Sequence, residues 1–395
     1  EGWMPSNDGL SRVDSWREES FRGLGRVVGP HPPFQIAPPM SLPTEPIGSI
    51  PRPEEVIEGL KAYRRGDLSQ EALNQIADRA LRATIGAFED TGSPVITDGE
   101  QAKPSFLTYP IEGADNVEPG GVEIPFEAGH TRTLPRLTAG PFRYQTYAAE
   151  YLERAQAYAS VPVKQSVISA SALSFLYPDD GLDGYARAAF LEDLVDEVEA
   201  DIRRCLDAGA PAVQMDFTEG RLAVKLDPSK GLLREFVALN NRVLDRFSDE
   251  ARQRIGVHTC PGGDKDSTHS ADVDYAELLP LLFDLNVGRF YMQFASEDEP
   301  ARVLDVVREH STDDQTIFLG VTDVNDPRVE SPEEVRDTIL RAAEHLSPER
   351  LGTTDDCGFS PFGDDRSTAR RTAFDKIEAR VEGTRRARQT LGRPE

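Results

Sequence analysis

The sequence is poor in cysteine and in long apolar runs, and each shortage excludes a class of protein. Its three cysteines, Cys205, Cys260 and Cys357, are too few and too far apart for the disulfide framework of a small secreted domain. No run approaches the roughly 20 apolar residues that a membrane helix requires. The first residues also lack the basic and apolar regions of a signal peptide. We therefore expect a cytoplasmic protein with reduced thiols and no membrane segment.

Positive charge is also scarce. The chain of 395 residues has 44 lysines and arginines against 69 aspartates and glutamates, which gives a formal net charge of −25. Binding to nucleic acid requires a cationic surface that displaces counterions from phosphates. We therefore expect no nucleic acid as a partner. Hydrophobic residues make up 38% of the chain and charged residues 29%, which is typical of a globular protein.

The N-terminal part of the chain differs from the rest. Residues 1–44 show no sustained periodicity, and the stretch 29–53 holds nine prolines. Such a composition favours extended, irregular backbone. We interpret residues 1–44 as a proline-rich arm and residues 45–395 as one domain.

Short apolar runs alternate with helical stretches beyond the arm, and this alternation predicts an α/β fold with parallel strands. We expect eight strands, at residues 46–50, 94–98, 163–169, 212–217, 255–260, 289–295, 316–322 and 351–355. Eight such units favour a closed (β/α)8 TIM barrel. A doubly wound open sheet is the alternative, but residues 46–51 lack the glycine-rich phosphate turn that usually follows its first strand.

The segments between the expected strands contain clear helix signals and one insertion. Apolar residues recur at helical spacing over residues 191–208, and Ser331-Pro332-Glu333-Glu334 is typical of a capped helix start. Residues 99–151 break the alternation of strands and helices. We expect them to form an insertion after the second strand, over one mouth of the barrel, with a hairpin inside it.

Metal-ligating residues occur at two expected strand ends, where a (β/α)8 barrel places its reacting groups. His258 and Cys260 end the fifth strand on the same side, because side chains alternate along a strand. Cys357 follows the eighth strand. One imidazole and two thiolates suit Zn²⁺, which keeps an open fourth position in catalytic sites. A thiol bound to zinc loses its proton at neutral pH, so the set predicts alkyl transfer to sulfur.

Acidic residues follow two other expected strands: Glu100 after the second, and Asp216 and Glu219 after the fourth. Carboxyl groups at such places can hold a substrate ammonium or move protons. Asp216 and Glu219 are therefore candidate catalytic residues. Cys205 lies in an amphipathic stretch and is expected to be a buried small hydrophobe. We interpret His269, which has no companion ligand in the sequence, as structural.

These residues resemble the motifs of the catalytic barrel of cobalamin-independent methionine synthase and of related single-barrel proteins, which include epoxyalkane:coenzyme M transferase. The resemblance covers roughly residues 46–384. It rests on Ile47-Gly48-Ser49-Ile50-Pro51, Asp98-Gly99-Glu100, the strand end at Asp216, His258-Thr259-Cys260 and Asp356-Cys357-Gly358. It implies that zinc is bound by His258, Cys260 and Cys357. It further implies that the amino-acid end of a thiol substrate is bound by Ile47, Ser49, Glu100 and Asp216.

The fourth zinc ligand departs from the pattern of the family. The family has a glutamate at the end of the sixth strand, and strand register places Gln293 there. Glu297 lies four residues further on and is a second candidate. A structural zinc site in a protein without turnover would have four protein ligands. The lack of a clear glutamate therefore favours an open, catalytic site.

Two further departures concern the alkyl donor. The family's histidine proton donor after the seventh strand corresponds to Asn325, an amide, and Asp323 or Asp326 is the candidate replacement, with Asp323 preferred as a catalytic residue. Residues 169–172 lack the tryptophan with which the family stacks on folate. The resemblance thus implies a zinc-dependent methyltransferase acting on homocysteine or a similar thiol. Epoxide opening by zinc-bound coenzyme M is the alternative.

Overall fold

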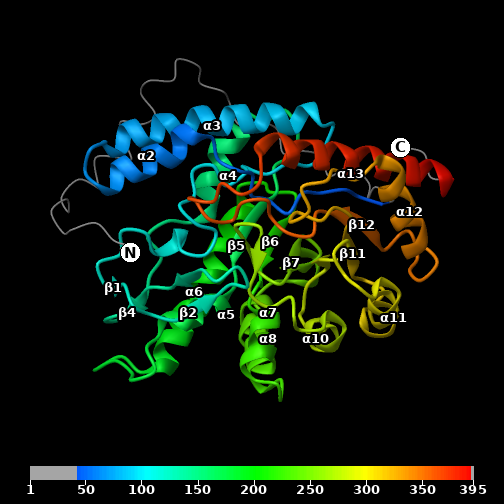
Figure 1. Ribbon diagram of the computed structural model, residues 1–395. Helices are drawn as coiled ribbons and strands as arrows, with labels where there is room; N and C mark the ends of the chain where they lie inside the picture. Colours follow the sequence, from blue (N-terminus) through cyan, green and yellow to red (C-terminus); the bar gives the residue numbers. More distant parts are fainter. Residues whose placement is uncertain (1–41, 393–395) are drawn as a thin grey trace.

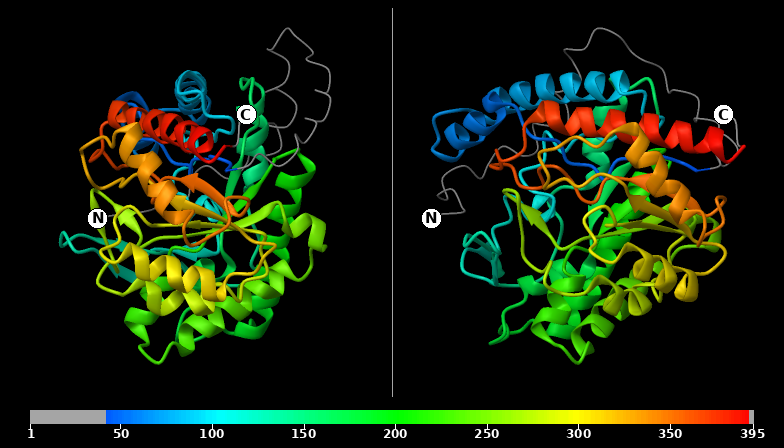
Figure 2. Two further views of the ribbon diagram at one scale, coloured as in Figure 1. Left: turned by 90° about the vertical axis from the view of Figure 1, so that its right-hand side faces the viewer. Right: turned by 45° about the vertical axis from the view of Figure 1, so that its right-hand side comes forward.

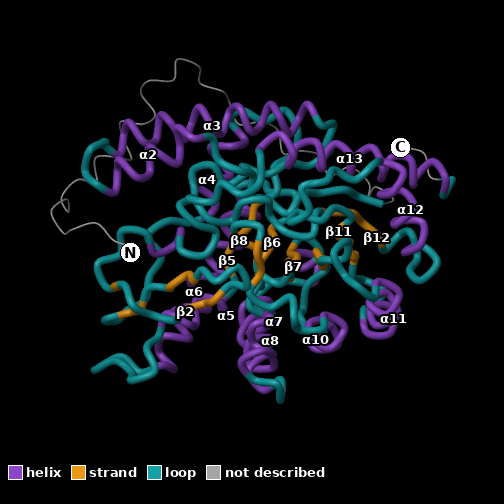
Figure 3. Tube along the Cα trace, in the orientation of Figure 1, coloured by secondary structure: helices purple, strands orange, loops and turns teal. Residues whose placement is uncertain are grey.

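A parallel sheet occupies the centre of the computed structural model, which describes residues 42–392 (Figure 3). Within this range its strands follow the order β12-β11-β10-β7-β6-β5 and are all parallel to their neighbours. Their bounds are β5 (Gln165–Ile168), β6 (Val213–Asp216), β7 (Ile255–Thr259), β10 (Arg289–Met292), β11 (Thr316–Gly320) and β12 (Leu351–Thr354). The predicted α/β class is confirmed, and these strands match six of the eight that the sequence predicts.

The two other predicted strands, at residues 46–50 and 94–98, are not regular strands, so the sequence prediction was wrong there. A single bridge joins each region to one edge of the sheet: Thr44, two residues before the first segment, pairs with Thr353 in β12, and Ile96 pairs with Val163 just before β5. Pro46 and Pro94 fall inside the two segments. Since proline has no N–H to donate, it interrupts a ladder of hydrogen bonds.

The two segments also contact each other at the edges of the sheet. The backbone N–H of Ile50 donates to the carbonyl oxygen of Gly99 at 3.1 Å. The hydroxyl of Thr97 donates to the carbonyl oxygen of Gly48 at 2.8 Å. Backbone contacts therefore lead from β12 through both segments to β5.

Helices cover both sides of the sheet (Figures 1 and 2). In both figures α3 and α13 lie on one side and α8, α10 and α11 on the opposite side. The rings of Phe88 and Phe374 join α3 to α13, edge to face, with centroids 5.4 Å apart. The helix bounds are α2 (Glu54–Arg64), α3 (Gln70–Asp90), α4 (Ala148–Gln156), α5 (Ala170–Leu173), α6 (Arg187–Asp207), α7 (Gly220–Leu226), α8 (Gly231–Leu244), α9 (Asp249–Arg252), α10 (Tyr275–Leu282), α11 (Pro300–His310), α12 (Pro332–Ala342) and α13 (Arg370–Thr390).

Two helices confirm the signals that the sequence contains. In α12 the Ser331 hydroxyl accepts from the N–H of Glu334, and the Glu334 carboxylate accepts from the N–H of Ser331. Such a reciprocal pair satisfies two of the N–H groups left open at a helix start. The helix expected at 191–208 is α6, and it buries Cys205 completely.

The predicted insertion contains two short antiparallel pairs, as expected. These are β1 (Val117–Glu118) with β4 (Arg136–Leu137), and β2 (Glu123–Pro125) with β3 (Thr131–Thr133). A further hairpin follows β7 and consists of β8 (Gly263–Asp264) and β9 (Ser267–Thr268). Figure 1 shows the insertion beside one end of the sheet.

Most of the predicted N-terminal arm, residues 1–41, lies outside the described residues. Among the described helices, none is long and apolar enough to cross a membrane.

Candidate metal centre and substrate cavity

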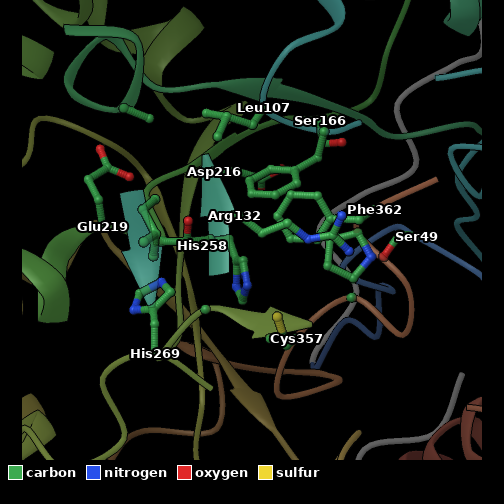
Figure 4. A pocket seen from close by; sticks show the side chains of 18 of the residues that line it. Ser49, Leu107, Arg132, Ser166, Asp216, Glu219, His258, His269, Cys357 and Phe362 are labelled. Carbon is green, nitrogen blue, oxygen red and sulfur yellow. The ribbon is translucent and has the colours of Figure 1, made fainter. Parts of the chain in front are cut away.

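A buried group of one histidine and two cysteines lies where β7 and β12 end. The candidate ligand atoms of His258, Cys260 and Cys357 all lie within 4.8 Å of one another. The two sulfur atoms are 3.1 Å apart. Figure 4 shows His258 and Cys357 side by side at the wall of a cavity. The structure thus brings together the three residues that the sequence predicts as zinc ligands.

The orientation of His258 suits a metal ligand. Its Nδ1 lies 3.2 Å from the carbonyl oxygen of Tyr291, and since a carbonyl only accepts, Nδ1 carries the proton. The other ring nitrogen, Nε2, is buried and has no hydrogen-bond partner among the described residues. Unpaired buried polar atoms are rare in proteins. A neutral imidazole held by a backbone carbonyl, with its second nitrogen free, is the usual form of a histidine ligand.

The two thiols also fit a cation. The contact with the Cys260 sulfur, together with burial, raises the pKa of the Cys357 thiol well above its ordinary value. Without a cation the Cys357 thiol resists the loss of its proton, because a second sulfur lies against it in a buried place. Zinc reverses this preference, since it binds thiolates and releases their protons. His258, Cys260 and Cys357 therefore form a donor set that fits zinc, with at least one position open.

Glu297 does not belong to this group. Its carboxylate instead pairs with the guanidinium of Arg221, which is itself buried and lies over the Tyr275 ring. A carboxylate that is paired with an arginine is neutralised and is not available as a metal ligand. The placement therefore does not match the prediction that Glu297 is the fourth ligand.

Gln293 has the position that suits this role better. In the parallel pair of β10 and β7, Tyr291 faces His258 and Met292 faces Thr259, so Gln293 continues the register opposite Cys260. The Gln293 amide nitrogen donates to the Ser296 hydroxyl at 2.6 Å. Its Oε1 is buried and has no partner among the described residues. The amide is thus fixed with its oxygen free.

Asp356 connects the loops that carry Gln293 and Cys357. One of its carboxylate oxygens accepts from the backbone N–H groups of Phe294 and Ala295 at 2.8 and 2.9 Å. The other accepts from the N–H and the hydroxyl of Ser296 at 2.9 and 2.7 Å. Burial raises the pKa of Asp356 to about 7 despite these donors. These four donors occupy both oxygens of the Asp356 carboxylate. The carboxylate therefore holds the loop that carries Cys357 against residues 294–296 and does not contact substrate.

A cavity with about 800 Å³ of space free of atoms opens beside the metal group. Of the predicted site residues, Ile47, Ser49, Glu100, Asp216, Glu219, His258 and Cys357 line it. Asp323 does not belong to this lining, and its carboxylate accepts from the N–H of Asn325 in its own turn. The placement therefore does not match the prediction that Asp323 is a catalytic residue. Asn325 is exposed to solvent.

Glu100 is the most constrained acid in the cavity. Its backbone φ is +57°, a conformation that residues other than glycine rarely adopt. Its carboxylate accepts from the Ser166 hydroxyl at 3.1 Å and lies 3.6 Å from the Lys103 ammonium. Burial raises the pKa of Glu100 to about 7, the charge of Lys103 opposes this shift, and Asp216 adds to it. A cationic ligand at this place would restore the carboxylate.

Asp216 and Glu219 extend the acidic wall. Asp216 accepts from the amide of Gln214 at 2.7 Å, and burial raises its pKa. Glu219 accepts from the hydroxyls of Ser169, at 2.7 Å, and Ser171. Burial raises the pKa of Glu219 to about 7. The polar side of the cavity thus carries three carboxyl groups and attracts cations.

The other walls of the cavity are apolar. Side chains of the insertion, of α5 and α7 and of the last loop supply them: Phe106, Leu107, Ile124, Phe126, Leu134, Ala172, Phe175, Leu222 and Phe362. Arg132 of the insertion also lines the cavity, but the carboxylates of Asp264 and Asp364 neutralise its charge at 2.6 and 2.9 Å. The insertion therefore closes the site with an uncharged surface.

His269 lines the cavity too, although its lack of a companion ligand in the sequence predicts a structural role. Its Nδ1 is 2.8 Å from the Ser270 hydroxyl, which donates to the carbonyl of Pro261, so Nδ1 carries the proton. Burial and the charges of Lys225 and Arg221 lower the pKa of His269 to about 4, which keeps the ring neutral. The signal in the sequence that could have predicted this position of His269 is the Gly-Gly turn at 262–263, which folds the chain back over β7.

Comparisons with known proteins show the family of this chain. The family model of the catalytic domain of cobalamin-independent synthase matches residues 42–372. The chain belongs to this family. All the cavity residues discussed above lie inside the matched range, so the resemblance seen in the sequence is confirmed.

This member of the cobalamin-independent synthase family has relatives of low sequence identity that align with most of its length. The methionine synthase of Saccharolobus islandicus is 22% identical over 352 residues, which is 89% of this chain and 96% of the relative. That of Sulfurisphaera tokodaii is 22% identical over 351 residues, 89% of this chain and 94% of the relative.

Solved structures support the fold. The B12-independent methionine synthase of Shewanella sp. W3-18-1, in complex with selenomethionine, has a TM-score of 0.69 at 20% identity and covers 89% of this chain and 98% of its own. The putative vitamin-B12 independent methionine synthase of Listeria monocytogenes has a TM-score of 0.65 at 20% identity, with 87% and 97% covered. This cobalamin-independent synthase family member thus shares their fold. The relatives do not favour the epoxide-opening alternative.

Proposed function

We propose that this protein is a zinc-dependent methyltransferase that transfers a methyl group to the sulfur of homocysteine or a similar amino-acid thiol. The observation that carries the proposal is the buried group of His258, Cys260 and Cys357 beside a cavity with three carboxyl groups. The names of the relatives agree with it. The resemblance of the motifs supplies the reaction type.

The fold that we propose for this function is the (β/α)8 barrel. The segments at 46–50 and 94–98 supply the two remaining strands of the barrel, because they contact each other and because residues 43–45 pair with β12 and Ile96 pairs with Val163 just before β5. In such a barrel the carboxyl ends of all strands meet at one mouth. His258, Cys260 and Cys357 would then converge at this mouth with Glu100 and Asp216.

Different residues of the chain would bind the metal and the substrate. His258, Cys260 and Cys357 would hold zinc, and Gln293, which continues the strand register opposite Cys260, would offer a neutral amide oxygen. Zinc, when bound, lowers the pKa of a substrate thiol so that the sulfur becomes a nucleophile at neutral pH. Glu100, a carboxyl group with a free oxygen, takes the ammonium group of the substrate.

The charge of the cavity favours an amino-acid thiol over an anionic one. Glu100 and Asp216 line it, and the Arg132 charge is taken up by two aspartates. A sulfonate such as that of coenzyme M would face these carboxyl groups without a free cation beside it in the described lining. Homocysteine offers an ammonium, which the same groups attract.

The test is a mass-spectrometric assay for S-methylation. Zinc-loaded and zinc-stripped protein are each given homocysteine or coenzyme M, with methyltetrahydrofolate or methylcobalamin supplied separately as donor. We expect methionine to form only with zinc, and homocysteine to react at least about 10-fold faster than coenzyme M, a discrimination of about 1.4 kcal/mol. Methionine formation that is independent of zinc, or no methionine from either donor, would overturn the proposal.

A further inference from the structure

Glu219 stands out because its two carboxyl oxygens have different surroundings. The residue precedes α7, lines the cavity with Asp216 and His258, and is only 5% exposed. Its Oε1 accepts hydrogen bonds from two hydroxyls, whereas its Oε2 is buried and has no partner among the described residues. Figure 4 shows the side chain at the edge of the cavity.

The two hydroxyls are held in place by their own partners. Ser169 begins α5 and donates to Glu219 at 2.7 Å. Ser171 donates to the same oxygen and itself accepts from the amide nitrogen of Asn240 at 2.8 Å. The Asn240 amide oxygen accepts from the N–H of Ser171 at 3.2 Å. The Ser171 hydroxyl also lies 3.3 Å from the Ser169 hydroxyl, but its contact with Oε1 is the shorter one, so its single proton goes to Oε1 and this oxygen accepts from both serines.

This arrangement determines where a proton on Glu219 resides. An oxygen that already accepts from two hydroxyls has no room for a proton of its own. The proton of the neutral acid is therefore on Oε2, the oxygen without a partner. Among the described residues no lysine, arginine or histidine forms an ion pair with Glu219, and burial raises its pKa to about 7. Glu100 differs, because the Lys103 ammonium lies 3.6 Å from it.

The neighbours of Glu219 in the cavity favour an uncharged ligand. Ala172 and Phe175 lie on or next to α5, which also carries its serine partners, and Leu222 lies on α7. Apolar walls beside one acid with a free proton suit the body of an uncharged alkyl donor. The same walls do not offer a charge of their own to stabilise an anionic leaving group.

We propose that Glu219 is the general acid of the reaction, and that its Oε2 donates a proton to the leaving atom of an alkyl donor seated in the apolar part of the cavity. The class of donor is one in which the reacting carbon is bonded to a basic leaving atom, an amine nitrogen or an alkoxide oxygen. This assignment rests on the proposed thiol alkylation. It concerns how the donor is activated, not how the thiol is.

The step balances in atoms and charge. The thiolate sulfur attacks the carbon of the donor, a sulfur–carbon bond forms, and the carbon–nitrogen or carbon–oxygen bond breaks with its electron pair on the leaving atom. That atom takes the proton from Oε2 of Glu219. The carboxylate then regains a proton from water, which has taken up the proton released by the thiol. The net reaction is a thiol and a donor giving a thioether and the protonated leaving group.

The test compares donors that need an acid with donors that do not. The leaving atom is an amine nitrogen in methyltetrahydrofolate and an alkoxide oxygen in epoxypropane. Iodide and cob(I)alamin, which leave from methyl iodide and methylcobalamin, need no proton. Wild type and Glu219→Gln, each loaded with zinc, are assayed with homocysteine in single turnovers against zinc-stripped blanks. Glutamine keeps the oxygen that accepts from Ser169 and Ser171 but has no acidic proton.

We expect Glu219→Gln to lose at least about 100-fold in rate with whichever basic donor the wild type uses, as for other general acids. With methyl iodide and methylcobalamin its rate should stay within about 3-fold of wild type. The distinction between the two arms is the readout that a merely structural role would not produce. Zinc content, measured on the same samples, controls for folding of the site.

Other outcomes overturn the assignment. An equal loss with all donors, or no loss with any, removes Glu219 from the role of acid. A wild type that reacts with methyl iodide or methylcobalamin but with neither basic donor removes the proposed donor class while thiol alkylation stands. A wild type that does not exceed the zinc-stripped blank even with methyl iodide overturns the proposed function itself, and the assignment with it.

Discussion

The sulfur atoms of Cys260 and Cys357 lie 3.1 Å apart, although 97 residues separate them in the chain. They follow β7 and β12, and two strands, β10 and β11, lie between these in the sheet. In a flat sheet three strand spacings amount to about 14 Å. Cys357 lies three residues beyond the end of β12, so the loop after this strand brings its thiol to the end of β7. This contact makes the metal group a consequence of the whole fold rather than of one motif.

Removal of one of these sulfurs should abolish the metal site. We expect Cys357→Ser to lower zinc content to below about a tenth of wild type, as loss of a direct ligand does, and to abolish methyl transfer. Cys205→Ser is the matched control, because Cys205 is a buried thiol of α6 outside the group. Zinc per chain is measured by mass spectrometry after gel filtration. Full occupancy of Cys357→Ser would remove Cys357 from the ligand set.

The structure also separates the two candidates for the fourth ligand. We expect Gln293→Ala to weaken zinc binding by roughly 10-fold, since Gln293 continues the register opposite Cys260 and its buried Oε1 has no partner among the described residues. Glu297→Gln should leave zinc affinity within about 2-fold, because its carboxylate already pairs with Arg221. Competition with a chromophoric chelator measures both affinities. A larger loss of zinc affinity in Glu297→Gln than in Gln293→Ala would identify Glu297 as the fourth ligand.

The metal group was predictable from the sequence because it depends on local rules. Alternation along a strand places His258 and Cys260 on one side, and an expected strand end places Cys357 at the same edge. The fourth position was not predictable in this way, since the role of Glu297 depends on Arg221, 76 residues earlier in the chain. The position of His269 depends on the hairpin after β7. The segments at 46–50 and 94–98 were wrongly predicted as regular strands, because their apolar residues suggest strands that their prolines interrupt.

The hairpin after β7 can be tested at one glycine. Gly262 has a φ of +72°, and a Cβ there would lie 1.8 Å from Nε2 of His269. We expect Gly262→Ala to lower the free energy of unfolding by roughly 2–4 kcal/mol, through strain and the displaced ring. In a His269→Ala background the same change should cost only about 1–2 kcal/mol, the penalty of the backbone conformation. Urea unfolding of the four proteins gives the coupling, and equal costs in both backgrounds would contradict the contact.

Burial of Glu219 has a consequence for stability that depends on pH. Because its pKa rises from 4.5 to about 7 on folding, the folded state prefers the neutral acid. Below about pH 4.5 the burial of Glu219 therefore does not lower the free energy of unfolding of the wild type relative to Glu219→Gln. As the pH rises toward 7, the wild type loses stability relative to the variant. Above pH 7 the variant should be more stable by up to about 3 kcal/mol.

Urea unfolding of zinc-stripped, reduced protein at several values between pH 5 and 8.5 measures this difference. Glu127→Gln, an exposed residue of the insertion, is the matched control and should show no such trend. A variant that is less stable than wild type at pH 8.5 would contradict the buried, neutral state of Glu219.

In the proposed reaction the metal site is open to the sulfur of the substrate. X-ray absorption at the zinc edge, recorded with and without homocysteine and in the absence of any donor, shows whether this sulfur reaches the metal. We expect two sulfur neighbours of zinc, at about 2.3 Å, in the free protein and three after homocysteine binds. Two sulfur neighbours at saturating homocysteine would contradict the claim and leave a zinc ion that serves only the structure.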